Sequence, residues 1–195
     1  MPAISTGELL RAETAKKSDL GLKAVRFVKR GQLVPDKLIH EMMAKRLKRN
    51  DVKKGFILDG YPRDQVQLDD LLGLVQDKYD IWVVNIDLSP KEVLNRLSGR
   101  RICTKCGASF HLLYKPSKKA GVCDVCGHKL TLRPDDKPEV VKERLKHYQA
   151  TATPVLKFGK KNKKLVIIDG AQTIPKVHKD ILAAVKKINV KLINK

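Results

Sequence analysis

The chain has 195 residues, a length that suits one globular domain with small insertions. Hydrophobic residues make up 42% of it and charged residues 32%, the usual proportions of a globular protein. The longest apolar runs, such as Ile81–Val84 and Leu165–Ile168, are far too short to cross a bilayer, which excludes a membrane-spanning protein. No segment resembles a signal peptide, so we expect a cytoplasmic protein without a membrane partner.

Basic residues exceed acidic residues by a wide margin. The sequence holds 41 Lys and Arg against 21 Asp and Glu, which gives a formal net charge of +20. Such a surface attracts polyanions: nucleic acid, anionic lipid or phosphorylated metabolites. The lysines are scattered along the chain and are most plentiful in its last third, and no strand has the basic and aromatic pattern of an RNA-recognition module. We therefore interpret most of them as solvated surface and do not expect nucleic acid as a partner.

Short apolar strands alternate with helical patterns, which predicts an α/β fold with a parallel sheet flanked by helices. Ser5 and Glu8 have the spacing of a capping box, so the first helix is expected to begin near Thr6. A second helix is expected over 20–29, and Pro35 opens a third. The remaining expected elements are a buried strand at 55–59, a helix at 65–76, a buried strand at 81–87, a helix from Ser89, a long helix from 136 toward His147, a strand at 165–169 and a closing helix at 173–188.

Residues 100–137 differ in character from the rest of the chain. They contain all four cysteines, three glycines and two prolines, with little periodic pattern. We interpret this stretch as an inserted, metal-binding lobe. Residues 1–99 and 138–195 then form the core α/β domain.

The four cysteines form two close pairs: Cys103 and Cys106, then, after a gap of 16 residues, Cys123 and Cys126. A glycine follows each pair and permits a tight turn, so four thiolates can converge on one tetrahedral ion. The pattern favours Zn²⁺, and a closed shell of four sulfurs makes that ion structural and not catalytic. A vestigial or redox-active site is the alternative.

The stretch from Gly55 to Arg63 is the most informative part of the sequence. A buried strand is expected to end at Asp59, a glycine turn follows, and Arg63 comes next. Ligands of open α/β sheets lie at the carboxyl ends of the strands. There Asp59 can hold Mg²⁺ through water and Arg63 can form paired hydrogen bonds with a phosphate. A salt bridge that satisfies both residues at the strand end explains this pattern equally well.

Further arginines favour phosphate chemistry over that salt bridge. Arg11 follows the first helical turn, and Arg100 enters the lobe. Arg133 leaves the lobe, and Arg144 lies on the next helix. Phosphoryl transfer needs positive charge around the phosphates and little covalent chemistry from the protein. Arginines at the edges of a mobile lobe supply that charge when the lobe closes, and closure also excludes water.

Seven stretches of the chain resemble, in order, the signatures of adenylate kinases: 4–11, 31–36, 55–63, 97–103, 133–136, 142–145 and 168–170. No single stretch is specific, but together they are, and they cover essentially the whole chain. The resemblance implies a nucleoside monophosphate kinase of nucleotide homeostasis that interconverts ATP plus AMP with two ADP, using Mg²⁺. It also implies an AMP-binding insertion at about 5–34 and a zinc-bearing lid at 100–137.

The resemblance assigns roles by position. AMP would contact Thr6, Arg11, Gln32, Leu33, Val34, Gly60, Tyr61, Pro62, Arg63, Gln67, Arg133 and Arg144. ATP would contact Arg100, Ser109, Phe110 and Gln172. The catalytic residues would be Arg63, Arg100, Arg133, Arg144 and, through Mg²⁺, Asp59. The zinc ligands would be Cys103, Cys106, Cys123 and Cys126. Phe110 stands where many relatives have tyrosine, so a stacking role is kept and a hydroxyl contact is lost.

The resemblance further implies an N-terminal strand, the loop G-x-x-x-x-G-K-[ST] and a helix, and the sequence contains none of them. About 25 residues are therefore expected to be absent, through a mis-assigned start or a truncation, unless a substitute phosphate site exists. Because that loop cradles the ATP phosphates, kinase activity is in doubt and AMP is expected to bind better than ATP. The family's strand lies between those at 55–59 and 81–87, so the completed protein is expected to be a monomer and the truncated one to associate through open strand edges.

Two other functions fit parts of the sequence. A basic four-cysteine zinc ribbon that binds RNA or the ribosome would use the net charge and the paired cysteines, but it has no need of the motif at 59–63. The other is an inactive fragment that binds nucleotide and transfers nothing. Relatives specific for GMP or UMP share several motifs, but the lobe's length and zinc pattern favour AMP.

Overall fold

The computed structural model describes residues 1–30 and 34–193. Its α-helices are α1 (Thr6–Ala15), α2 (Asp19–Arg30), α3 (Asp36–Leu47), α4 (Gln65–Val75), α5 (Pro90–Ser98), α6 (Pro138–Thr151), α7 (Thr153–Lys161) and α8 (Ile174–Ile193). Its strands are β1 (Ala3–Ser5), β2 (Ile57–Asp59), β3 (Val83–Asp87), β4 (Arg100–Cys103), β5 (Ser109–His111), β6 (Leu130–Thr131) and β7 (Leu165–Asp169), and short 3-10 turns are η1 (Asn50–Val52), η2 (Gln76–Lys78) and η3 (Pro134–Asp136). Within the described ranges, no helix has both the length and the apolar composition that crossing a bilayer requires.

The core strands form two separate parallel pairs. β1 pairs with β2, ending in the register Ser5–Asp59, and β3 pairs with β7, ending in the register Asp87–Asp169. Among the described residues no ladder of hydrogen bonds joins β2 to β3. A cavity of about 1270 Å³ lies between them, bordered also by α6 and α8. The α/β fold with parallel strands and flanking helices is therefore confirmed, in a divided form.

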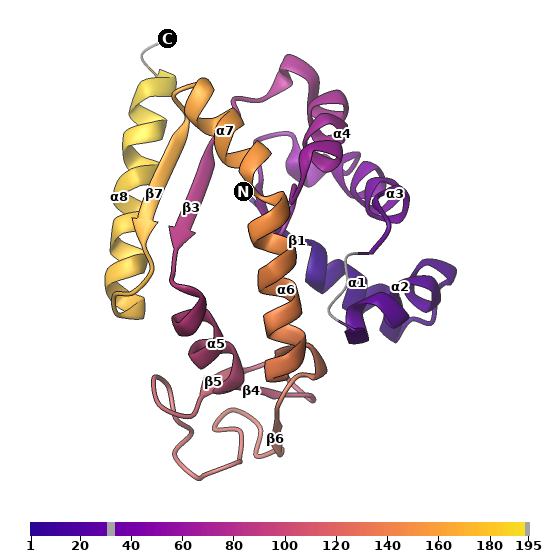
Figure 1. Cartoon of the computed structure of the whole chain (residues 1–195), viewed down its shortest axis with the longest axis vertical. Coiled ribbons are helices and arrows are strands. Elements are labelled where there is room, and N and C mark those ends of the chain that lie inside the picture. The colour runs from indigo at the N-terminus through magenta and orange to yellow at the C-terminus, as the bar shows by residue number, and fades with distance from the viewer. Residues whose placement is uncertain (31–33, 194–195) are drawn as a thin grey trace.

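Figure 1 shows how the helices surround these pairs. β3 and β7 lie against α8 on one side of the molecule, and α1 to α4 gather around β1 on the other. α6 runs between the two groups, from the lobe at 100–137 toward the core. The arrowheads of β3 and β7 point toward that lobe, so the carboxyl ends of these strands and the lobe share one end of the molecule.

Two core elements, β1 and α7, are not predicted by the sequence. β1 has only three residues, too few for an alternating pattern to be visible. α7 is separated from α6 by Ala152, and Pro154 lies in its first turn. Because proline lacks the backbone N–H that a continuing helix needs, the predicted long helix ends and a second one begins.

The two predicted buried strands are shorter and more exposed than expected. β2 covers only Ile57–Asp59, and the Ile57 side chain is 52% exposed. β3 begins at Val83, and its residues Val84 and Ile86 are 38% and 47% exposed. The prediction of buried strands was therefore wrong. Each strand has a neighbour on one side only in the described part of the chain, and its other edge borders the cavity.

The largest hydrophobic core lies beneath α1, α3 and α4. On α3 the predicted apolar face is confirmed, since Ile39, Met42 and Met43 are all buried at helical spacing. Val52, which follows α3, and Ile4 of β1 join the same cluster. This packing fixes β1 beside β2 and so positions the residues that follow both strands.

The start of α1 agrees with the prediction, but its capping box does not form. Ser5 makes no capping hydrogen bond, because it is the last residue of β1 and is paired with Asp59. The neighbouring Thr6 hydroxyl instead donates to the Gly60 carbonyl at 3.1 Å. At α5 the predicted cap is present, with Ser89 accepting a hydrogen bond from the Glu92 amide at 3.2 Å.

Candidate functional site

Four of the predicted AMP-side residues meet at the carboxyl end of β2. Thr6 is buried and donates to the Gly60 carbonyl, which also accepts a 2.7 Å hydrogen bond from Arg63 Nε. Gln67 is buried, and its Oε1 accepts from the Arg63 amide at 3.0 Å. Gly60 has φ +74°, and a Cβ there would lie 2.9 Å from the Arg63 guanidinium, so this turn requires glycine.

Arg63 and Arg144 lie close enough for their charges to oppose each other. Burial lowers the pKa of Arg63, and the positive charge of Arg144 lowers it further, whereas Asp59 raises it. Arg144 is held from the other side by the Asp135 carbonyl, at 3.2 Å. Two guanidinium groups and one carboxylate thus lie at the end of β2. A bound anion there would stabilise the two positive charges.

Three further arginines gather where the lobe joins the core. Burial lowers the pKa of Arg133, and the charges of Arg100 and Arg11 lower it again. Arg100 forms a two-pronged pair with Asp136, at 2.6 and 2.7 Å, and Asp136 is fully buried. Arg133 Nε is buried without a hydrogen-bond partner in the described part of the chain. Asp136 lies in the stretch 133–136 that resembles an adenylate kinase signature, but the sequence did not predict its pairing with Arg100.

The remaining predicted AMP-side residues have mixed outcomes. Val34 is buried in the core cluster, as is the Tyr61 ring. Pro62 follows Tyr61 through a cis peptide bond and carries the chain from β2 toward Arg63. Gln32 and Leu33 lie outside the described residues, so their predicted role stays a prediction.

The predicted ATP-side residues divide between the lobe and the core. Ser109 is exposed on β5, while Phe110 is buried in the lobe's own small core with Cys103, Cys123 and Leu130. Gln172 lies after β7 and donates to the Asp169 carbonyl at 3.0 Å and to Asp180 at 3.1 Å. Its Oε1 is buried and has no hydrogen-bond partner among the residues described.

Arg96 is a candidate site residue that was not predicted from the sequence. Its Nε pairs with Glu92 at 2.7 Å, and a terminal nitrogen donates to the Gln172 carbonyl at 3.3 Å. Its guanidinium also lies over the ring of Tyr114, 5.5 Å from the centre. The spacing of Glu92 and Arg96 on one helix predicts their pair, but the contact with Gln172 depends on the fold.

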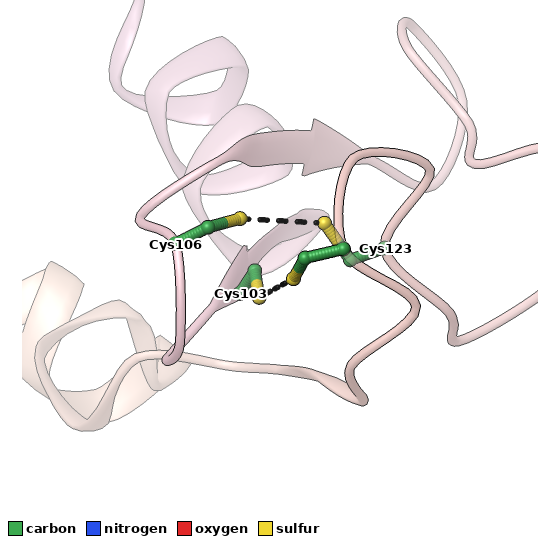
Figure 2. A group of neighbouring side chains, drawn as sticks. Cys103, Cys106 and Cys123 are labelled. Atoms are coloured by element: carbon green, nitrogen blue, oxygen red, sulfur yellow. Dashed lines mark hydrogen bonds between the residues drawn. The ribbon is translucent and has the colours of Figure 1, made fainter.

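The four cysteines meet at one point of the lobe. Their sulfur atoms all lie within 4.8 Å of one another, with Cys103 3.4 Å from Cys126 and Cys106 3.6 Å from Cys123. Figure 2 shows Cys103 and Cys106 from one turn and Cys123 from the other, with their sulfur atoms directed toward one another. Gly107 and Gly127 donate to the carbonyls of the first cysteine of each pair, both at 2.9 Å. The predicted convergence of the four thiols is confirmed, and they are placed to bind a metal ion.

The electrostatics of these thiols suit a cation. Burial raises the pKa of Cys103, but hydrogen bonds from the backbone at Cys106 and from the Cys126 thiol outweigh it and bring the value to about 6. The Ala108 backbone lowers the pKa of Cys106, but Cys126 and burial raise it to about 12. Cys103 is therefore the more acidic thiol, whereas Cys106 and Cys126 hold their protons more tightly. A metal ion would replace those protons.

The comparisons with known proteins identify the family of this chain. Residues 1–164 match the model of the family described as adenylate kinase. A protein named adenylate kinase from Methanocella arvoryzae is 44% identical over 191 residues, covering 96% of this chain and 88% of that protein. Another, from Caldicellulosiruptor bescii, is 44% identical over 187 residues, covering 94% and 86%. A third, from Latilactobacillus sakei, is 44% identical over 192 residues, covering 96% and 86%. This chain therefore belongs to the adenylate kinase family.

Proposed function

We propose that this protein is a nucleoside monophosphate kinase that moves a phosphoryl group reversibly between ATP and AMP to give two ADP. The observation that carries the proposal is two groups of arginines from separate parts of the chain: Arg63 with Arg144, and Arg133 with Arg100 and Arg11. Burial lowers the pKa of Arg63 and of Arg133, and both values are lowered further by repulsion, from Arg144 at Arg63 and from Arg100 and Arg11 at Arg133. Bound phosphates would relieve this repulsion, and most relief comes where charge is greatest, in the transition state.

The AMP subsite is proposed at the carboxyl end of β2. Thr6, Gly60, Arg63 and Gln67 are already joined there by hydrogen bonds, so the subsite is largely preformed. Arg63 would take the phosphate of AMP as a two-pronged donor. The other AMP residues would be Arg11, Gln32, Leu33, Val34, Tyr61, Pro62, Arg133 and Arg144, with residues 5–34 forming an AMP-binding insertion.

The ATP subsite is proposed between the lobe and the turn that follows β7. Gln172 and Arg96 share a hydrogen bond there, and Ser109 lies on the lobe. Arg100 and Arg133 would meet the phosphates as residues 100–137 close over them. Phe110 would support that surface from within the lobe's core. Asp59, beside Arg63, would hold Mg²⁺ through water.

The four cysteines are proposed to hold Zn²⁺. Four thiolates form a closed tetrahedral shell, so the ion would order the lobe and take no part in phosphoryl transfer. The metal-bound lobe would then move as one rigid body against a core made of residues 1–99 and 138–195. Because β2 and β3 are each open at one edge in the described part of the chain, this chain is proposed to associate.

The test is ADP formation from ATP and AMP by this 195-residue chain, purified with zinc and assayed with Mg²⁺. A coupled assay should follow both directions, and activity should track the protein through purification. Arg144→Lys keeps the charge and removes the planar fork, so it is the matched control for contamination. Turnover that this substitution leaves unchanged would contradict the proposal.

Isothermal titration of AMP and of ATP separates the two subsites. The preformed contacts around Arg63 predict that AMP binds the chain more tightly than ATP does. ATP binding that exceeds AMP binding would contradict this assignment. If neither nucleotide produces heat on titration, the proposed function itself is overturned. That result would favour an RNA-binding zinc ribbon.

A further inference from the structure

The lysine-rich turn before β7 projects from the end of the molecule opposite the lobe. Lys160, Lys161 and Lys163 are exposed, and Lys163 has φ +57°. The turn runs Gly159-Lys160-Lys161-Asn162-Lys163-Lys164 and contains no apolar side chain. From it β7 runs toward the lobe, so the turn lies at the strands' amino ends.

Segments distant in sequence lie at the same end as this turn. The Val83 amide donates to the Lys164 carbonyl at 2.9 Å, which places the turn beside the start of β3. Figure 1 shows the C-terminal half of α8, which carries the exposed Lys186–Lys187 pair, at the end of the molecule where β7 begins.

A second loop reaches the same end before β2. Tyr79 donates from its hydroxyl to the Val52 carbonyl at 3.3 Å, which ties the segment leading into β3 to the loop that carries Lys53 and Lys54. Both lysines are exposed and border the same cavity. The basic end is defined here as Lys53, Lys54, Lys160, Lys161, Lys163 and the Lys186–Lys187 pair.

The charge of the basic end is not neutralised by neighbouring acids. Lys164 forms an ion pair with Asp80, and Asp51 is paired with Arg46 at 2.7 Å. None of the lysines of the basic end forms an ion pair within the described residues. Several positive charges therefore face solvent together, which the scatter of lysines in the sequence does not show. The resulting potential attracts a polyanion.

We propose that the basic end binds the phosphate backbone of nucleic acid. Ammonium groups on flexible stems act as point charges toward successive phosphates and need no base contacts. A lipid surface is disfavoured, because membrane-binding segments combine basic residues with apolar side chains that enter the bilayer, and the turn has none. The lysine-rich turn lies at the amino ends of β3 and β7, whereas the lobe with Arg100 and Arg133 lies at their carboxyl ends.

The test compares two triple variants of equal charge in the full chain. Lys160→Gln/Lys161→Gln/Lys163→Gln removes three charges from the basic end. Lys16→Gln/Lys17→Gln/Lys23→Gln, the α1–α2 variant, removes three exposed charges from α2 and from the turn between α1 and α2. The two variants also match in backbone conformation, since Lys17 has φ +53° and Lys163 has φ +57°. Fluorescence anisotropy with labelled poly(U), repeated with poly(dT), gives the affinity at several salt concentrations.

The basic-end variant should lose about tenfold or more in affinity for poly(U), and its slope of log affinity against log salt should fall by about 2. The α1–α2 variant should change affinity by about twofold or less. Equal losses in the two variants would overturn the proposal, because the charge would then act diffusely. Retention on phosphatidylserine vesicles without binding to either polymer would also overturn it. Kinase turnover is not part of the readout, so a failure of the proposed activity leaves the test intact.

Discussion

The carboxylate of Asp136, which is fully buried, accepts two hydrogen bonds from the guanidinium of Arg100, at 2.6 and 2.7 Å. Arg100 opens the lobe and Asp136 closes it, so this pair fastens the two ends of residues 100–137 together. A buried carboxylate depends on its cation, because burial without a partner is costly. The same pair fixes the side chain that is proposed to meet the ATP phosphates.

Asp136→Asn should lower the free energy of unfolding by about 2–3 kcal/mol, since it leaves Arg100 without its counter-charge. Asp135→Asn is the matched control, because Asp135 lies 3.8 Å from Arg144 in a more open pair. That control should cost about 1 kcal/mol or less. Urea unfolding followed by circular dichroism measures the free energy of unfolding of both variants. Equal decreases would show that the Asp136–Arg100 pair stabilises the protein no more than the Asp135–Arg144 pair does.

Arg63→Ala should weaken AMP binding by about tenfold or more, because a charged hydrogen bond to a phosphate is lost. Turnover should fall by about a hundredfold or more, since the same charge is needed in the transition state. Stability should change little, because the one hydrogen bond of the Arg63 side chain within the described residues, to the Gly60 carbonyl, is offset by the loss of its repulsion with Arg144. Titration calorimetry, a coupled assay and thermal unfolding separate these effects. Near-normal AMP binding would remove Arg63 from the proposed subsite.

Removal of the metal should loosen the lobe and leave the core intact. Freshly purified protein should contain about one zinc ion per chain, and less than about half an equivalent would count against the site. After chelation, limited proteolysis should cut first between residues 104 and 130, while AMP binding persists. Zinc added back under reducing conditions should restore protection. Cuts that begin in α1 or α3 would contradict this division.

Tyr61 should make the protein sensitive to alkaline pH. Burial raises the pKa of its phenol above the ordinary 10.0, and Asp70, Asp64 and Asp36 raise it further. The folded state therefore favours the neutral phenol, so this contribution to stability is complete below pH 10 and is lost as the pH rises above it.

The measurement is urea unfolding at about pH 8 and about pH 10.5, on either side of the ordinary phenol pKa. Tyr61→Phe should reduce the loss of stability between the two pH values, and it should cost little at neutral pH, because the hydroxyl has no hydrogen-bond partner in the described part of the structure. Tyr148→Phe, at a 51% exposed position, is the control and should leave the pH dependence unchanged. A steeper dependence in the Tyr61 variant would refute the assignment.

The sequence predicts local features well where the signal lies within one element. The spacing of Ile39, Met42 and Met43 predicts the buried face of α3, and the four cysteines predict their own convergence. The rule that ligands lie at strand ends predicts the cluster around Arg63 for the same reason, since one strand and the turn after it carry the residues.

What the sequence does not predict depends on contacts between distant segments. Arg96 meets Gln172 across 76 positions, and Arg100 meets Asp136 across 36. The division of the strands into two pairs is likewise a property of the assembled chain, so the expected burial of β2 and β3 was wrong. Ser5 shows the limit of motif reading, because pairing in β1 takes precedence over the cap it would otherwise form.

Each short sulfur contact of the lobe joins one cysteine pair to the other, Cys103 with Cys126 and Cys106 with Cys123. An oxidant that removes hydrogen from these thiols would therefore form disulfide bonds between the two turns and not within them. Two forms of metal-free protein follow from this arrangement. Chelation under reducing conditions gives an open lobe that zinc can restore, whereas oxidation gives a cross-linked lobe that keeps its outline and responds to a reductant instead of to zinc.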